Sequence, residues 1–202
     1  MNKVITISRQ FGSGGREIGA KLAEKLGIPF YDNELITRAA KESGFAEAVF
    51  ENAEKKATSS LLYSIAMGMS SYGSQDLGFS HLSLDDRIYL AQSNVIRKVA
   101  EEGPCIIIGR CADYILRDRD DCLHIFIHAD NEHRAKRILE KYGPTDKTTT
   151  QRIKDKDNRR RNYYRFHTDR DWGIATNYSL TLNSGVLGED TCVDIILKAM
   201  ED

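Results

Sequence analysis

The sequence predicts a doubly wound α/β fold, in which a parallel β-sheet is covered by helices on both faces. Two observations lead to this prediction. Strand-like and helix-like segments alternate along the 202 residues, and several apolar runs are short and uninterrupted, as in strands buried on both faces. Alternation of this kind is typical of β–α–β units, which give parallel sheets. The chain is long enough for one domain with its own hydrophobic core.

Five segments are expected to form the strands. The first follows the β-branched run Val4-Ile-Thr-Ile, and two others are apolar runs bounded by turn residues, such as Cys105-Ile-Ile-Ile-Gly109. Short apolar runs with such boundaries indicate buried strands. The expected strands cover residues 3–8, 29–31, 104–109, 123–129 and 178–182.

Helices are expected between the strands, where apolar residues recur every three or four positions. In the first of them Ile18, Leu22 and Leu26 share one stripe, and the segment from Gly27 to Pro29 ends it. Residues 58–83 are rich in Ser, Gly and Met and have little periodicity, which indicates a mobile insertion. The expected helices cover residues 15–26, 33–42, 46–56, 84–99, 131–142, 148–165 and 189–200.

The overall composition excludes some classes of function. The net charge is −1, so the molecule as a whole has no field that would draw it to nucleic acid or to an anionic membrane. The apolar runs are too short to cross a bilayer, and the first residues lack the apolar core of a signal peptide. The four cysteines form no C-x-x-C pair, which favours reduced thiols over disulfides or a zinc site. We therefore expect a cytoplasmic protein that binds neither nucleic acid nor membrane.

A glycine-rich turn between the first strand and the first helix is the main functional signal. Its glycines allow positive φ angles and close approach of a ligand to the backbone. The helix that follows at once directs its first N–H groups and the positive end of its dipole at the same point. The turn is therefore expected to bind the phosphates of a nucleotide through Gly12, Ser13, Gly14, Gly15 and Arg16; a plain glycine-rich turn is the alternative.

The turn departs from the ordinary P-loop, whose pattern is G-x-x-x-x-G-K-[ST]. Gly15 stands at the lysine position and Arg16 at the position of the Ser or Thr that helps to hold Mg²⁺. Arg16 is the nearest cation and can fork two phosphate oxygens, and Arg9, before the loop, is a second candidate. Direct contact of the loop with magnesium would have to come from Ser13 or from bound water.

Residues 152–165 form a second candidate element, with seven Lys or Arg side chains and two Asp. So many like charges repel one another on an isolated helix, which therefore gains little stability unless an anion binds. Phosphoryl transfer needs cations directed at the equatorial oxygens and the exclusion of water, and a basic helix that closes over phosphates would supply both. The alternatives are a solvated charged face and binding of single-stranded nucleic acid by the arginines with Tyr163 and Tyr164.

The chain resembles the cytidylate kinase family, within the P-loop nucleoside monophosphate kinases, through four motifs in the family's order. These are the glycine turn and the segments FYDNELITR, CIIIGRCADYIL and IKDKDNRRRN. The resemblance runs through nearly the whole chain and is weakest from residue 45 to residue 83. It implies a single P-loop kinase-like domain over residues 1–202, with a five-stranded parallel core, a helical acceptor-binding insertion at about 33–95 and a basic lid at about 144–172.

The acceptor site implied by the resemblance has two parts. An Asp–Ser pair at the end of the second strand, followed by an arginine, matches Asp32-Asn33 and Arg38, with asparagine in place of serine. The family's Asp-Gly-Arg-Asp element matches residues 108–111, where only the glycine and Arg110 carry over; Asp113 lies close enough to replace one acid. Acceptor binding is therefore assigned to Asp32, Arg38, Arg110 and Asp113.

The lid pattern of spaced arginines among acids falls on Lys156, Asp157, Arg159 and Arg161, with Arg160 where the family tends to have an aspartate. The resemblance implies a nucleotide kinase that uses ATP and Mg²⁺ and phosphorylates a nucleoside monophosphate, CMP or dCMP in the first place. Catalysis is assigned to Arg16, Lys156, Arg159 and Arg161. The absent lysine and acids keep two alternatives open: a nucleotide-binding sensor or scaffold with little kinase activity, and a P-loop kinase for a non-nucleotide acceptor.

Overall fold

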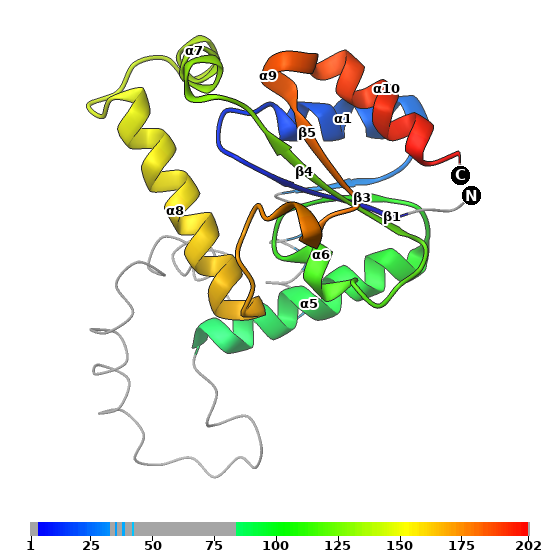
Figure 1. Ribbon diagram of the computed structural model, residues 1–202. Coiled ribbons are helices and arrows are strands. Elements are labelled where there is room, and N and C mark those ends of the chain that lie inside the picture. Colours follow the sequence, from blue (N-terminus) through cyan, green and yellow to red (C-terminus); the bar gives the residue numbers. More distant parts are fainter. Residues whose placement is uncertain (1–3, 33–34, 36–37, 39–41, 43–83, 202) are drawn as a thin grey trace, which may run out of the picture.

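Five strands form one parallel sheet in the order β2-β3-β1-β4-β5, which confirms the predicted fold class (Figure 1). The computed structural model describes residues 4–32, 35, 38, 42 and 84–201. The strands are β1 (Val4–Arg9), β2 (Phe30–Tyr31), β3 (Ile106–Ile108), β4 (Cys122–His128) and β5 (Leu180–Asn183). The ends of each strand lie within two residues of those expected from the sequence.

Helices cover both faces of the sheet. Those described are α1 (Gly15–Leu26), α5 (Leu84–Glu102), α6 (Ala112–Ile115), α7 (Asn131–Tyr142), α8 (Thr149–Thr168), α9 (Ser184–Leu187) and α10 (Glu189–Ala199), with a 3₁₀ turn at Ala175–Asn177. α1 and α7 begin and end where the sequence predicts. The helices expected at 33–42 and 46–56 and the insertion expected at 58–83 lie wholly or mostly outside the described residues. No helix in the described part of the chain combines the length and apolarity that a membrane span requires.

Side chains that alternate along the strands fill two hydrophobic layers. Ile5 and Ile7 of β1 belong to the layer beneath α1 and α10, whereas Val4 and Ile107 belong to the layer beneath α5 and α6. Figure 1 shows these two pairs of helices on opposite faces of the sheet. Burial on both faces explains why the strands are continuous apolar runs. Residues 84–95 of the expected insertion form the first part of α5, which contributes to the second layer.

The glycine turn lies where the order of the strands reverses. β1 is placed between β3 and β4, and the chain adds β2 and β3 on one side of it before it crosses to β4 and β5 on the other. In open α/β sheets, ligands bind outside the carboxyl ends of the strands at such a point. Because the turn directly follows β1, the fold places it at the expected ligand-binding edge.

Candidate active site

The glycine turn has the backbone conformation that its glycines allow. Gly12 (φ 82°) and Gly14 (φ 79°) lie in the left-handed region, and α1 begins at the next residue, Gly15. Gly12 also has no room for a side chain, because a Cβ there would meet Ile138 Cδ1 at 2.8 Å. The first N–H groups of a helix have no partner within the helix. The start of α1 therefore presents donors and a positive dipole end at the carboxyl edge of the sheet.

Ser13, by contrast, directs its side chain into the protein. It is 1% exposed, and its Oγ lies 2.9 Å from the Gln10 carbonyl oxygen and 3.1 Å from that of Ile127. Ser184 Oγ donates to the Ser13 carbonyl at 2.6 Å. These bonds tie the turn to β4 and to the start of α9. Because the side chain is 1% exposed, a contact between the Ser13 hydroxyl and a magnesium ion outside the turn would require the side chain to change its orientation.

A buried ion pair holds the backbone of the turn at Phe11. The Phe11 N–H donates to Asp157 Oδ1 of α8 at 2.8 Å, and the Phe11 carbonyl accepts from Arg134 Nε of α7, also at 2.8 Å. Arg134 and Asp157 pair with each other and are only 3% and 6% exposed. Arg160 adds a hydrogen bond to the Arg9 carbonyl at 2.8 Å. Two helices therefore fix both polar backbone groups of one residue in the turn.

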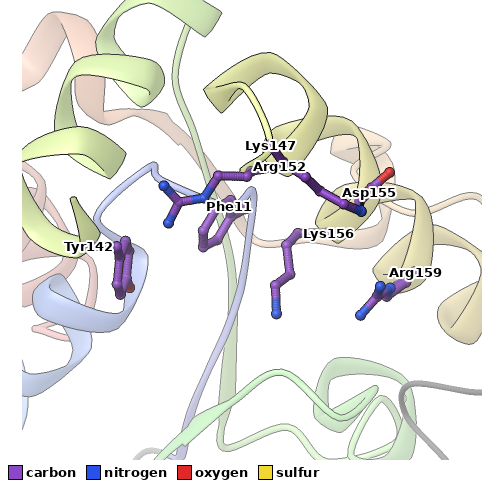
Figure 2. Close-up of a pocket in the computed structure, with 7 residues that line it drawn as sticks. All are labelled: Phe11, Tyr142, Lys147, Arg152, Asp155, Lys156 and Arg159. Atoms are coloured by element: carbon purple, nitrogen blue, oxygen red, sulfur yellow. Dashed lines mark hydrogen bonds and ion pairs between the residues drawn. The ribbon is translucent and has the colours of Figure 1, made fainter. Parts of the chain in front are cut away.

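A cavity of about 410 Å³ opens between the turn and α8 (Figure 2). Phe11 and Tyr142 stack in its wall with ring centroids 5.8 Å apart. Lys156 and Arg159, both predicted from the sequence to be catalytic, extend from α8 into this space. The lining residues comprise two aromatic rings, four cations and one carboxylate: Phe11, Tyr142, Lys147, Arg152, Asp155, Lys156 and Arg159. This excess of positive charge suits an anionic ligand.

Arg161, the third predicted catalytic residue of α8, lies outside the lining of this cavity. It is exposed, and its Nη1 donates to Asn158 Oδ1 at 2.6 Å. The buried residues of α8 are Ile153, Asp157, Tyr164 and Thr168. The helix runs three residues beyond its expected end at Arg165, because the burial of Thr168 favours helix in a segment with little helical pattern of its own.

Arg16 and Asp32 lie together at the end of β2. Arg16 Nε donates to Asp32 Oδ2 at 2.7 Å, and the Arg16 guanidinium carbon lies 5.7 Å from the centre of the Phe30 ring. Arg38, predicted to bind the acceptor with Asp32, has its Nη2 3.3 Å from Glu102 Oε1. The structure thus joins Arg16 to a predicted acceptor residue and places Arg38 against α5.

The segment that follows β3 has an unusual backbone. Gly109, Arg110 and Cys111 have φ angles of 73°, 58° and 56°, so three successive residues are left-handed and two of them are not glycine. A non-glycine residue in this region costs about 1–3 kcal/mol, and such residues cluster at functional sites. Their conformation turns the chain sharply and holds Arg110 at the carboxyl end of β3, where the sequence predicts acceptor binding.

Asp113, the remaining predicted acceptor residue, is buried where α6 meets α8. It is 5% exposed, and its carboxylate accepts from the Tyr164 hydroxyl at 2.7 Å. Burial raises the pKa of Asp113 to about 6, against the opposing effects of the Tyr164 hydrogen bond and the Arg170 charge. Asp113 borders a separate hollow with His124 and Tyr178 and does not line the cavity described above.

Comparison with known proteins identifies the family of the chain. The model of the cytidylate kinase-like family matches residues 4–186. The chain belongs to this family. A cytidylate kinase from Archaeoglobus fulgidus is 29% identical to it over 201 residues, which cover 98% of this chain and 94% of the archaeal protein.

Solved structures agree with the assignment of this cytidylate kinase-like chain to the P-loop kinase fold. An uncharacterized protein from Eubacterium ventriosum is 28% identical, with a TM-score of 0.72 and coverage of 100% of this chain and 99% of the other. Shikimate kinase from Bacteroides thetaiotaomicron (14% identity, TM-score 0.54, both chains covered completely) has the same fold. So does a gluconokinase from Sinorhizobium meliloti (12% identity, TM-score 0.54, covering 99% and 94%).

Sequence reasoning missed the pairing of Arg134 with Asp157, although one signal for it was present. Asp157 follows Ile153 by four positions and precedes Tyr164 by seven, so in a helix the three residues lie on one stripe. An acid on the apolar stripe of a basic helix requires a buried cation or strong donors, because an unpaired buried charge is costly. The partner itself could not be chosen from the sequence.

Proposed function

We propose that this protein is an ATP-dependent phosphotransferase that phosphorylates a nucleoside monophosphate, CMP or dCMP in the first place. One observation carries the proposal: Phe11 joins the glycine turn to the cation-lined cavity. Its backbone is held by α8, and its ring lines the cavity into which α8 directs its cations. The phosphate-binding turn and the basic helix, found separately in the sequence, are thus parts of one site in this proposal.

The turn and α8 have different tasks in the proposed reaction. Backbone N–H groups at Gly12–Gly15 bind the phosphates of ATP, and the α1 dipole favours their negative charge. Lys156 and Arg159 stabilise the transferred phosphoryl group, whose charge is spread over its equatorial oxygens. Arg16 and Arg161 keep their predicted roles as further catalytic cations, each after release from its present partner. Positioning and charge neutralisation supply most of the catalysis, without a covalent intermediate.

The acceptor is assigned to the edge formed by the ends of β2 and β3. Asp32 and Arg38 would bind it from the side of β2, and Arg110 from the end of β3, with the two arginines on its phosphate. Asp113 remains a predicted acceptor residue that would act from its buried position next to Tyr164. The choice of CMP or dCMP is supported by the family and by the name of the archaeal relative.

The site has features that suit the phosphates of ATP, whereas its described residues do not identify a ligand for magnesium. Left-handed glycines at the start of a helix and an excess of nearby cations suit a triphosphate. Within the described part of the chain, no group of three or more His, Cys, Asp or Glu side chains is arranged around a metal position. Magnesium that accompanies ATP is usually held by phosphate oxygens, waters and one or two carboxylates, and it would add positive charge at the phosphates.

The proposal is tested by incubating the protein with Mg-ATP and a panel of nucleoside monophosphates, and measuring ADP and the phosphorylated product. CMP or dCMP should give the highest kcat/KM. Lys156→Ala and Arg159→Ala should each lower kcat by about a hundredfold or more, as the loss of one charge-stabilising contact does in other enzymes. Lys198→Ala is the matched control, because Lys198 lies outside the cavity, in α10, and pairs with Glu201.

Two other outcomes would replace the proposal. Binding of ATP without turnover of any acceptor would favour a nucleotide sensor or scaffold, the reading that the glycine at the lysine position supports. Turnover of a small alcohol such as shikimate or gluconate, with no turnover of nucleoside monophosphates, would assign the fold to a non-nucleotide acceptor.

A further inference from the structure

Two replacements in the glycine turn are complementary. When the pattern G-x-x-x-x-G-K-[ST] is laid on residues 9–16, Arg9 stands at its first glycine and Gly15 at its lysine. One position has therefore gained a cation and the other has lost one. The two positions are six residues apart in sequence, at the end of β1 and at the start of α1.

The structure brings these two positions into contact. A Cβ at Gly15 would meet Arg9 Cβ at 2.6 Å and Arg9 Cγ at 3.0 Å. Gly15 is the first residue of α1, and its φ is not among the positive values of the turn, so its backbone would accept any side chain. A third contact would be with Ile127 Cβ at 3.2 Å, so the stem of Arg9 makes the two closest of the three contacts that keep position 15 a glycine. A side chain at position 9 and a lysine at position 15 therefore compete for the same space.

The charged end of Arg9 lies on the side of the turn where β2 and β3 end. Its Nη1 is in close contact with the position that a Cβ of Gly109 would occupy, and its Nη2 lies 3.9 Å from Asp32 Oδ1. The side chain is 19% exposed. A guanidinium is thus held between the start of α1 and the edge assigned above to the acceptor, and its planar fork can bind two phosphate oxygens at once.

Arg16, the other candidate for this task, has a different orientation. Its side chain is 50% exposed and donates through Nε to Asp32 Oδ2 at 2.7 Å, on the side of the Phe30 ring. It starts one residue further along α1. Arg9 is the cation whose stem crowds the position that a Cβ of Gly15 would occupy.

We propose that Arg9 takes the place of the P-loop lysine, so that a guanidinium carried by β1 contacts the outer phosphates of the bound nucleotide. The proposal deepens the proposed function and rests on it, because it assumes that the ligand of the turn is a polyphosphate. It predicts a result that a merely structural role for Arg9 would not give: a cation at position 15 must restore the phosphate affinity that is lost when the cation at position 9 is removed.

The test compares five variants with the wild-type protein: Arg9→Gln, Arg9→Gly, Arg16→Gln, Gly15→Lys, and the double variant with Arg9→Gly and Gly15→Lys. Calorimetry measures their affinity for ATP and for inorganic tripolyphosphate, which reports phosphate binding without any turnover. Arg9→Gln should weaken both by about 10- to 100-fold, the usual effect of losing a hydrogen bond to a charged group. Its turnover should fall by roughly a hundredfold or more.

The double variant should recover most of the affinity that Arg9→Gly loses, because removal of the Arg9 stem leaves only Ile127 Cβ, at 3.2 Å, close to the Cβ of the lysine, and a shift of a few tenths of an ångström accommodates it. Gly15→Lys alone should melt at a lower temperature than the wild type, since both stems then compete for that space. Arg117→Gln is the control for the loss of one positive charge away from the turn. Thermal melting of every variant shows whether a loss of binding is a loss of fold.

Three results would overturn the inference: wild-type affinity in Arg9→Gln, a larger loss in Arg16→Gln than in Arg9→Gln, or a double variant that binds no better than Arg9→Gly. The proposed function fails separately. A wild-type protein that binds tripolyphosphate in a manner dependent on Arg9, yet phosphorylates no acceptor, would refute the kinase proposal and support the role of Arg9.

Discussion

Replacing Asp113 by asparagine is expected to change how the stability of the protein depends on pH. Burial raises the pKa of Asp113 to about 6 from its ordinary value of 3.8, so the folded state holds this proton more tightly than the unfolded state. The stabilisation from this group is complete below pH 4 and is lost as the pH rises through 6. At 1.36 kcal/mol per pH unit, the buried carboxylate costs the folded state about 3 kcal/mol above pH 6.

His167 changes the pH dependence of stability in the opposite direction. Burial lowers its pKa to about 4 from 6.5, against a raising effect of Asp86, and its ring stacks on Tyr89 with centroids 4.1 Å apart. Because the folded state prefers the neutral ring, this contribution is complete above pH 6.5 and is lost as the pH falls towards 4, again by at most about 3 kcal/mol. The two contributions largely cancel in the wild-type protein between pH 4 and pH 6.5.

Urea unfolding followed by circular dichroism, at intervals from about pH 4.5 to about pH 8, separates the two groups. Asp113→Asn should be about 2–3 kcal/mol more stable than the wild type near pH 8, because the amide keeps a carbonyl for Tyr164 and carries no charge. This variant should lose stability on acidification, because the contribution of His167 is then no longer offset. His167→Phe, which keeps a ring against Tyr89, should gain stability on acidification. Parallel slopes in the two variants, or an Asp113→Asn variant less stable than the wild type near pH 8, would refute the reasoning.

Three further predictions concern the turn and its neighbours. Asp157→Asn leaves Arg134 buried without its counter-charge and should lower the free energy of unfolding in urea by about 3–5 kcal/mol. Exchanging both residues for apolar ones of similar volume should restore much of the lost stability. If it does not, the hydrogen bonds to the Phe11 backbone contribute more to stability than the ion pair does. Arg110→Gly should be about 1 kcal/mol more stable than Arg110→Ala, since glycine adopts the left-handed conformation without strain, and both variants should raise the KM for CMP; equal melting temperatures of the two variants would contradict this. Ser13→Ala deprives the Gln10 and Ile127 carbonyls of their hydroxyl neighbour and should cost about 1–2 kcal/mol in the same unfolding assay, whereas an unchanged value would show that this hydroxyl does not hold the turn.

The long elements of the fold could be predicted because their ends carry local signals. α1 ends at Gly27, which is left-handed, and α7 begins after Asp130, whose side chain accepts from the His133 N–H. The short helices α6 and α9 were missed, because four residues are too few to show a helical period. The end of α8 was also missed: Thr168 is buried by tertiary packing, which the polar sequence around it does not indicate.

The candidate site was predictable in its parts but not in their connections. The glycine turn and the basic helix each have a local pattern, and Lys156 and Arg159 line the cavity as the pattern suggests. The bond from the Phe11 N–H to Asp157 joins residues 146 positions apart, and only the fold brings them together. The crowding at Gly15 could not be predicted for the same reason, since the atoms that a Cβ there would meet belong to Arg9 of β1 and Ile127 of β4.

The charge pattern of α8 follows from these connections. An isolated helix with seven cations and two acids between residues 152 and 165 would repel itself. In the folded protein the charges of α8 lie on different sides of the helix. Asp157 is buried and pairs with Arg134, while Lys156 and Arg159 face the cavity. The same acid therefore packs the helix against the protein and accepts from the Phe11 N–H, next to the cations that line the cavity. The buried acid and Arg160 hold this basic helix to the glycine turn and to the end of β1 without a ligand, while its other cations line the cavity.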